Sequence, residues 1–78
     1  MDRTEHTMIA QANVLTEREL QILDLIIEEC SSAEIAVMLG ISQFTVHAHR
    51  KNMLDKIGSK GVVGLVKYWY ELHYYFDQ

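Results

Sequence analysis

The 78-residue chain has no proline, one cysteine and only four glycines, so strong helix breakers are rare. Nearly half of its residues are hydrophobic, which favours a compact helical domain over a disordered chain. Cys30 cannot form a disulfide within the chain, in agreement with a reducing compartment. We interpret Cys30 as a small buried hydrophobe, with a reactive thiol as the alternative.

Long apolar runs are also lacking. None approaches the roughly 20 residues needed to span a bilayer, and residues 1–13 lack the apolar core of a signal peptide. We therefore expect no membrane partner and a cytoplasmic protein. A chain of this length forms one small domain whose core is only marginally sufficient, so help from a partner chain is expected.

Catalytic patterns are missing as well. No glycine-rich phosphate loop follows a strand, and no nucleophile lies in a recognisable setting with a histidine and an acid. His47 and His49 are two residues apart on a predicted helix and face different ways, which disfavours a zinc site. We predict that the protein is not an enzyme and that the domain takes no cofactor, metal or small-molecule ligand.

Charge is unevenly distributed along the chain, whose net charge is −4. Residues 1–42 hold two basic and eight acidic side chains, whereas residues 43–78 hold five basic and three acidic ones. The net charge argues against a protein that coats nucleic acid indiscriminately, because such binding depends on phosphate neutralisation. The second half can nevertheless present a local positive surface.

Residues 1–13 are polar and weakly patterned, and we interpret them as a flexible arm or linker remnant that precedes a domain at 14–78. Thr16 and Glu19 form a capping-box pattern that predicts a helix over 17–29. Leu15 and Leu20 could form the accompanying hydrophobic staple. The expected buried stripe of this helix is Leu20, Leu23, Ile26, Ile27 and Cys30.

A helix-turn-helix pattern follows. Ser31–Ser32 offers an N-cap for a short helix over 33–39, which Gly40 ends. Almost no chain separates it from a second helix over 43–57, capped by Ser42 and closed by Gly58. The inward stripe of that helix is Val46, Met53 and Ile57, flanked by His49 and Arg50. Its outward side is predicted to hold Phe44, Ala48, Lys51 and Asp55, with His47 on the shoulder.

After a short connector, residues 62–76 are predicted to form a last helix, although Gly64 weakens it by about 1 kcal/mol relative to alanine. Apolar and aromatic residues surround most of it. One face can close the core, and the rest would form an exposed aromatic patch, which usually marks an interface. We favour a dimer interface over a ligand site and assign to it Val66, Trp69, Tyr70, His73 and Tyr74.

The segments LTERELQIL, SSAEIAVMLGIS, TVHAHRKNMLDKIG and GLVKY, in this order and spacing, resemble the LuxR-type (GerE-like) helix-turn-helix domain of bacterial transcription regulators. The resemblance extends from Leu15 to about Lys67. It implies an all-α domain of four helices whose third helix enters the major groove and whose fourth pairs two subunits on a two-fold symmetric site. The partners that it implies are double-stranded DNA and a second copy, with RNA polymerase or another regulator as a further candidate.

Carried over by position, the resemblance also implies residue roles. The base readers would be His47, Ala48 and Lys51. The phosphate contacts would be Ser42, Thr45, Arg50, Lys56 and Lys60. From the residues alone, His49 is better explained as a packed residue than as a base reader. Two choices remain open. Phe44 is either a thymine contact or an exposed turn residue, and Arg50 is either a phosphate ligand or a partner of Glu34.

We therefore predict a small transcription regulator that binds a specific DNA sequence, as a homodimer. The competing class is a protein interaction module of the same fold that works through the aromatic helix and binds DNA weakly or not at all. The net charge supports it, as do Ala33 and His47, which stand where the family often has basic residues. A third and weaker interpretation is the promoter-binding domain of a sigma factor.

Overall fold

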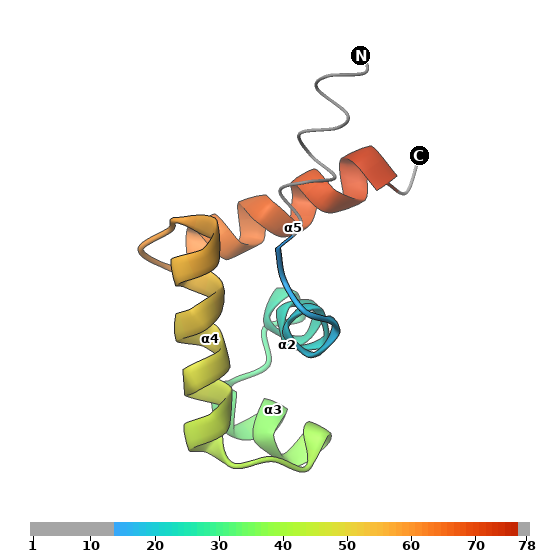
Figure 1. Ribbon diagram of the computed structural model, residues 1–78. Coiled ribbons are helices and arrows are strands. Elements are labelled where there is room, and N and C mark those ends of the chain that lie inside the picture. Colours follow the sequence, from blue (N-terminus) through green and yellow to red (C-terminus); the bar gives the residue numbers. More distant parts are fainter. Residues whose placement is uncertain (1–13, 77–78) are drawn as a thin grey trace.

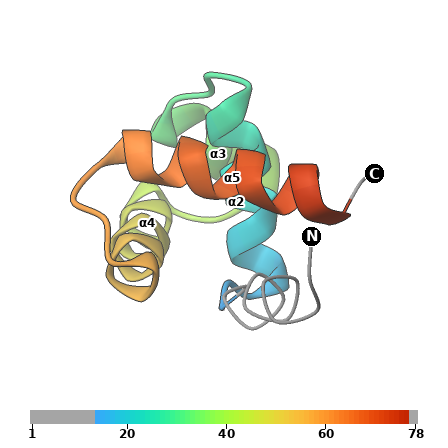
Figure 2. The same ribbon diagram turned by 90° about the horizontal axis from the view of Figure 1, so that it is seen from above.

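The computed structural model describes residues 14–76, and in this part of the chain it has four α-helices and no strand. The helices are α2 (Glu17–Ile27), α3 (Ser32–Leu39), α4 (Gln43–Ile57) and α5 (Val62–Phe76). In Figure 1, α4 and α5 form two arms of an angle, with α2 seen end-on between them and α3 at the foot of α4. Seen from above, α5 crosses over α2 (Figure 2). The predicted all-α fold is confirmed, whereas the predicted arm at 1–13 lies outside the described residues.

Three of the helices begin at the predicted capping residues. At α2 the N–H of Thr16 donates to Glu19 Oε1 (2.8 Å) and the N–H of Glu19 donates to Thr16 Oγ1 (3.1 Å). Ser31 and Glu34 form an equivalent capping box at α3. At α4 the Ser42 hydroxyl accepts from the N–H of Thr45 (3.0 Å). Each cap satisfies backbone donors that the first turn of a helix leaves without an intrahelical partner.

Each of these three helices is followed, within two residues, by a residue in the left-handed region. Gly40 closes α3 (φ 68°) and Gly58 closes α4 (φ 72°), as predicted, but at α2 the left-handed residue is Glu29 (φ 65°). The N–H of Cys30 then donates to the carbonyl of Leu25 (3.0 Å), which closes the last turn of α2. The predicted end of α2 at residue 29 was therefore wrong by two residues, because no glycine marks this turn.

The core lies where α2, α4 and α5 meet, and α3 covers the lower part of α4. Ile22 and Leu23 of α2 are fully buried, and Ile26 is nearly so. The predicted stripe of α2 missed Ile22, and Leu20, Ile27 and Cys30 are only half-buried. The stripe is displaced because Glu19, Ile22, Leu23 and Ile26 share one side of the helix, and that side faces the other helices. The remaining fully or nearly fully buried hydrophobic residues are Leu15, Ile35, Ala36, Val46, Met53 and Leu65.

Gly64, which the sequence marks as a weak point of α5, has a packing role. A Cβ atom at this position would overlap the side chain of Ser59 in the connector between α4 and α5. The Ser59 hydroxyl also donates to the carbonyl of Gly61 (3.1 Å). The missing side chain therefore allows the connector to fold tightly against the first turns of α5.

Candidate nucleic-acid interface

Helix α4 is anchored to the core along a narrow stripe. Val46 and Met53 are both fully buried, and Ile57 is half-buried one turn further on. These three positions are those that the sequence assigned to the inward face. His49 and Arg50, expected to flank the stripe, are half-buried as well. The interior contacts therefore determine which side of α4 faces solvent.

The opposite side of α4 is exposed along its whole length. Phe44, Ala48 and Lys51 are successive residues on one side of the helix, and all are exposed, as are His47 and Asp55. The structure thus brings the three predicted base readers together on one solvent-facing surface. We call this surface, formed by Phe44, His47, Ala48 and Lys51, the outer face of α4.

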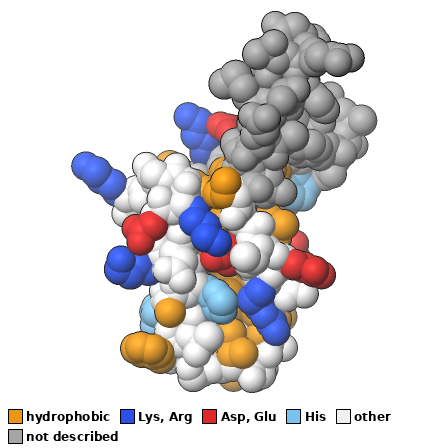
Figure 3. Space-filling model, viewed as in Figure 1, with side chains coloured by type: hydrophobic (Ala, Val, Ile, Leu, Met, Phe, Trp, Pro, Cys, Tyr) orange, Lys and Arg blue, Asp and Glu red, His pale blue; other side chains and the backbone are white. Residues whose placement is uncertain are grey.

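The outer face carries little net positive charge. Lys51 Nζ lies 3.3 Å from Asp55 Oδ2, one turn along the helix, with both side chains mostly exposed. An exposed pair of this kind contributes well under 1 kcal/mol and is screened by salt, so the ammonium group can exchange Asp55 for a stronger partner. In Figure 3, Lys and Arg side chains are scattered over the face in view with acidic side chains between them, instead of forming one continuous basic patch.

The predicted phosphate-contacting residues are spread over more than the length of α4. Ser42 and Thr45 lie at its beginning, where their hydroxyl oxygens are 2.8 Å apart. Arg50 is half-buried, and it forms no ion pair with Glu34 within the part of the chain that the structure describes. Lys60 is exposed in the connector after α4. The fifth residue, Lys56, forms an ion pair within the domain.

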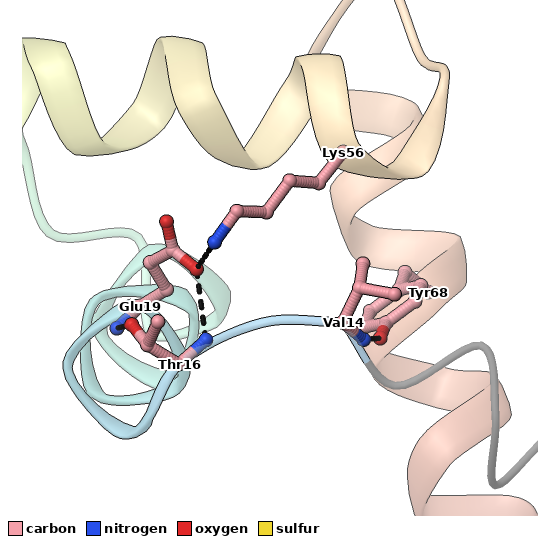
Figure 4. A network of polar contacts seen from close by, with 5 residues as sticks. All are labelled: Val14, Thr16, Glu19, Lys56 and Tyr68. Atoms are coloured by element: carbon pink, nitrogen blue, oxygen red, sulfur yellow. Dashed lines mark hydrogen bonds and ion pairs between the residues drawn. The ribbon is translucent and has the colours of Figure 1, made fainter.

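Lys56 reaches from the last turn of α4 to the start of α2, where its Nζ atom lies 2.8 Å from Glu19 Oε1 (Figure 4). The same carboxylate oxygen accepts the capping hydrogen bond from the N–H of Thr16. The Glu19 side chain is 4 % exposed, whereas that of Lys56 is 36 % exposed. Glu19 is therefore a buried charge that accepts a hydrogen bond from the helix cap and is neutralised by Lys56, and this ion pair ties α4 to α2.

Two pKa shifts accompany this network. Burial opposes ionisation of Glu19, but the hydrogen bonds from Lys56 and from the Thr16 backbone outweigh it and lower the pKa of this carboxyl below its usual value of 4.5. Burial raises the pKa of the Tyr68 phenol, against the effect of the N–H of Val14, which donates to its oxygen (3.1 Å). Tyr68 thereby joins α5 to the segment that leads into α2.

The predicted interface residues of α5 divide into two groups. Tyr70 and Tyr74 are each 62 % exposed, and with Lys67 and Glu71 they line a shallow groove. Val66, Trp69 and His73 are half-buried. The Trp69 indole N–H donates to Asp24 Oδ1 of α2 (2.8 Å), and its ring stacks on that of His73 (centroids 3.7 Å apart).

Two carboxylates of α2 that bind side chains of α4 and α5 were not predicted as such from the sequence. Glu19 was recognised only as a capping residue, and Asp24 was given no role. The capping box was a signal for Glu19, because a carboxylate that reaches back to the cap is held near the helix start, where a lysine from another element can meet it. No sequence signal pairs Asp24 with Trp69, which lies 45 residues further along the chain.

Within residues 14–76, no helix is long and apolar enough to cross a membrane. The described residues also contain no group of three or more His, Cys, Asp or Glu side chains placed to hold a metal ion. Two short helices joined by a tight turn, the second with an exposed outer face, define a helix-turn-helix domain.

Comparison with known proteins identifies the family. The family model described as bacterial regulatory proteins, luxR family, matches residues 13–69. The chain therefore belongs to the LuxR family, which confirms the resemblance seen in the sequence.

Several regulators align with this domain. The transcriptional regulatory protein TdiR of Thauera aromatica is 44% identical over 54 residues, which are 69% of this chain and 24% of TdiR. MctR of Rhizobium johnstonii is 46% identical over 69% of this chain and 25% of its own length. UhpA of Escherichia coli is 40% identical over 68% of this chain and 27% of its own length. The chain thus spans about a quarter of the curated relatives that it matches, and no solved structure gives a significant match.

Proposed function

We propose that this domain binds a specific sequence of double-stranded DNA as a bacterial transcription regulator, with α4 in the major groove. The observation that carries the proposal is the outer face of α4 on a LuxR-family helix-turn-helix. Fully buried Val46 and Met53 hold the helix on the core, and its opposite side is exposed and has no core contacts of its own. A B-DNA major groove admits an α-helix presented in this way.

In this proposal each side chain of the outer face has its own chemistry. Lys51 donates to guanine O6 and N7 after leaving Asp55, and His47 donates to the same kind of acceptor. Ala48 contacts a thymine methyl group. Phosphates are contacted by Ser42, Thr45, Arg50 and Lys60. Lys56 also contacts a phosphate, but its ammonium group is shared with Glu19. A cytoplasmic location, where chromosomal DNA lies, accompanies the proposal.

We further propose that two copies pair through the α5 surface. Tyr70 and Tyr74 expose large aromatic rings and help to line a shallow groove, a composition typical of protein interfaces. Trp69 supports this surface from inside through its hydrogen bond to Asp24. A two-fold pair would place its two α4 helices in successive major grooves, about 34 Å apart on a pseudo-palindromic site. RNA polymerase or another regulator is a further proposed partner.

The proposal is tested by binding the purified chain to a random-sequence duplex and to duplexes selected from a random pool, over a range of salt concentrations. We expect selection of a defined sequence, bound more tightly than the random duplex, with an affinity that falls as salt rises. A concentration series by analytical ultracentrifugation measures pairing, and Tyr70→Ser with Tyr74→Ser should weaken it.

A second candidate function is a protein interaction module of the same fold. Two of the predicted DNA-contacting lysines, Lys51 and Lys56, are already paired with carboxylates, and the net charge is −4. Exposed Tyr70 and Tyr74 would then serve a partner protein. Absence of measurable binding to any duplex at low salt would favour this candidate and reject the first.

A further inference from the structure

Phe44 stands out on the surface of the described domain. It is the second residue of α4, and it is 82 % exposed. Unlike the exposed Tyr70 and Tyr74, it has no hydroxyl group to hydrogen-bond with water. The fold does not need its ring, because Ser42 caps the helix and Val46 anchors the first turns. An exposed aromatic ring on a helix that is anchored in this way is available for contact with another molecule.

The position of this ring is informative. Phe44, Ala48 and Lys51 follow one another on the same side of α4, so the ring extends the outer face towards the beginning of the helix. In helix-turn-helix proteins it is the first turns of the recognition helix that contact base edges. By contrast, the exposed Val37 and Met38 line a separate apolar patch on α3.

We propose that Phe44 selects a pyrimidine that carries a 5-methyl group, through contact of its ring with that methyl in the major groove. This inference rests on the proposed function. The groove displays hydrogen-bonding groups on every base pair, and the methyl group at C5 is the apolar feature among them. A phenyl ring cannot satisfy the acceptors of guanine or the donor of cytosine, and covering them would cost their hydration. The ring therefore favours the methyl-bearing base.

The spacing along α4 predicts where this base lies. Phe44 and Lys51 are seven residues apart, or about 10 Å along a helix axis. With base pairs about 3.4 Å apart, this corresponds to roughly three base-pair steps. When α4 lies along the groove, the methyl-bearing pyrimidine and the guanine bound by Lys51 should therefore be within about three base pairs of each other in each half-site.

The experiment uses the full chain and a duplex selected from a random pool. Each thymine of the selected site is replaced in turn by deoxyuridine, which removes only the 5-methyl group. A thymine that contacts Ala48 would also be sensitive to this replacement. The position assigned to Phe44 is therefore the one, in each half-site, at which the wild type should lose about fourfold in affinity, the value for burial of one methyl group, and Phe44→Ala should lose none. Phe44→Ala should bind the thymine and deoxyuridine duplexes equally, and Phe44→Leu should retain part of the difference.

Val37→Ala is the matched control, because Val37 is 83 % exposed but lies on α3, away from the outer face. It should keep the wild-type preference for thymine. A further duplex carries 5-methylcytosine opposite guanine at the same position. If this duplex binds more tightly than the one with unmethylated cytosine, the methyl group itself is the recognised feature. If the two duplexes bind alike, the preference is for thymine alone. Circular dichroism checks that every variant is folded.

Two results would overturn the inference while leaving the proposed function intact. One is a wild-type protein that selects a sequence but binds every thymine and deoxyuridine duplex alike. The other is a Phe44→Ala variant that keeps the full preference for thymine, which would assign the methyl contact to Ala48. Failure of the wild type to enrich any duplex would instead reject the proposed function, and this inference with it.

Discussion

Helices α4 and α5 are both 15 residues long and both contact α2, yet they present opposite kinds of surface to solvent. Helix α4 has a narrow buried stripe, and its outer face combines the polar His47 and Lys51 with the apolar Phe44 and Ala48. Helix α5 is apolar over most of its circumference, and it leaves tyrosines exposed. The contrast is consistent with the proposed roles of the two helices, in which α4 contacts DNA and α5 contacts a second protein chain. Variants that affect one helix alone can test it.

The largest effect should come from the anchor of α4. Met53 is fully buried, so Met53→Ala should lower the free energy of unfolding by about 2–5 kcal/mol. This loss is enough to unfold much of so small a domain and to abolish both the proposed DNA binding and the proposed pairing. Urea denaturation measures this loss. Asn52→Ala, an exposed neighbour on the same helix, should change stability by less than about 0.5 kcal/mol. Similar stabilities of the two variants would show that α4 does not depend on its buried stripe.

The next effect concerns the connection between α4 and α2. Lys56→Met keeps the apolar stem but leaves the Glu19 carboxylate buried without its cation, and should lower the free energy of unfolding by about 1–3 kcal/mol. The matched control, Lys51→Met, breaks only an exposed pair and should cost less than about 1 kcal/mol.

Acid should reduce the difference in the free energy of unfolding between Lys56→Met and the wild type. The pKa of Glu19 is lowered by folding, so its contribution is fully present above the ordinary carboxyl value and is lost as pH falls through the lowered one. In the variant, burial without the lysine should raise this pKa. Denaturation curves at decreasing pH should therefore converge, and a constant gap would count against the ion pair as the cause.

A smaller structural change should have a selective effect on binding. Lys51→Ala should weaken binding to the selected duplex by about 1–3 kcal/mol and relax the preference for guanine at one position, with pairing through α5 unchanged. Competition with duplexes that differ at single positions measures this. Unchanged sequence selection by this variant would remove Lys51 from the base readers.

The smallest effect should come from the connector. Lys60 is exposed and is proposed to contact a phosphate, so Lys60→Ala should weaken binding to all duplexes alike and reduce the slope of log affinity against log salt by about 1. Parallel salt titrations with selected and random duplexes check the prediction. A loss confined to the selected duplex would indicate a base contact.

The sequence predicted most of α4 because its caps and its stripe are local signals. Ser42, Gly58, Val46 and Met53 lie where the pattern placed them. The end of α2 was mispredicted because Glu29 adopts a left-handed conformation that usually requires glycine. Ile22 was missed because the true inward side is set by which helices pack against α2, and a single-helix pattern does not contain that information.

For the candidate site, the sequence predicted which side chains are exposed, but not which of them form ion pairs or hydrogen bonds with other helices. The outer face is solvent-facing as expected from helical spacing. Lys56 was counted among the phosphate contacts from its position in the family resemblance, and its pairing with Glu19 was not foreseen because the two residues lie 37 positions apart in the chain. Trp69 was assigned to the interface, and its hydrogen bond to Asp24 shows that a residue of an aromatic patch can also fasten two helices together. Long-range side-chain pairs of this kind depend on the tertiary fold.

The tight corner at Ser59 and Gly64 has a consequence for the geometry of any assembly built from this domain. The side chain of Ser59 occupies the space that a Cβ atom at Gly64 would take, so the connector packs directly on the backbone of α5, and we expect this contact to restrain the angle between α4 and α5. Pairing through α5 would transmit that angle to both copies of α4. The corner would then set the separation between the two halves of the DNA site, independently of the bases that each half contains.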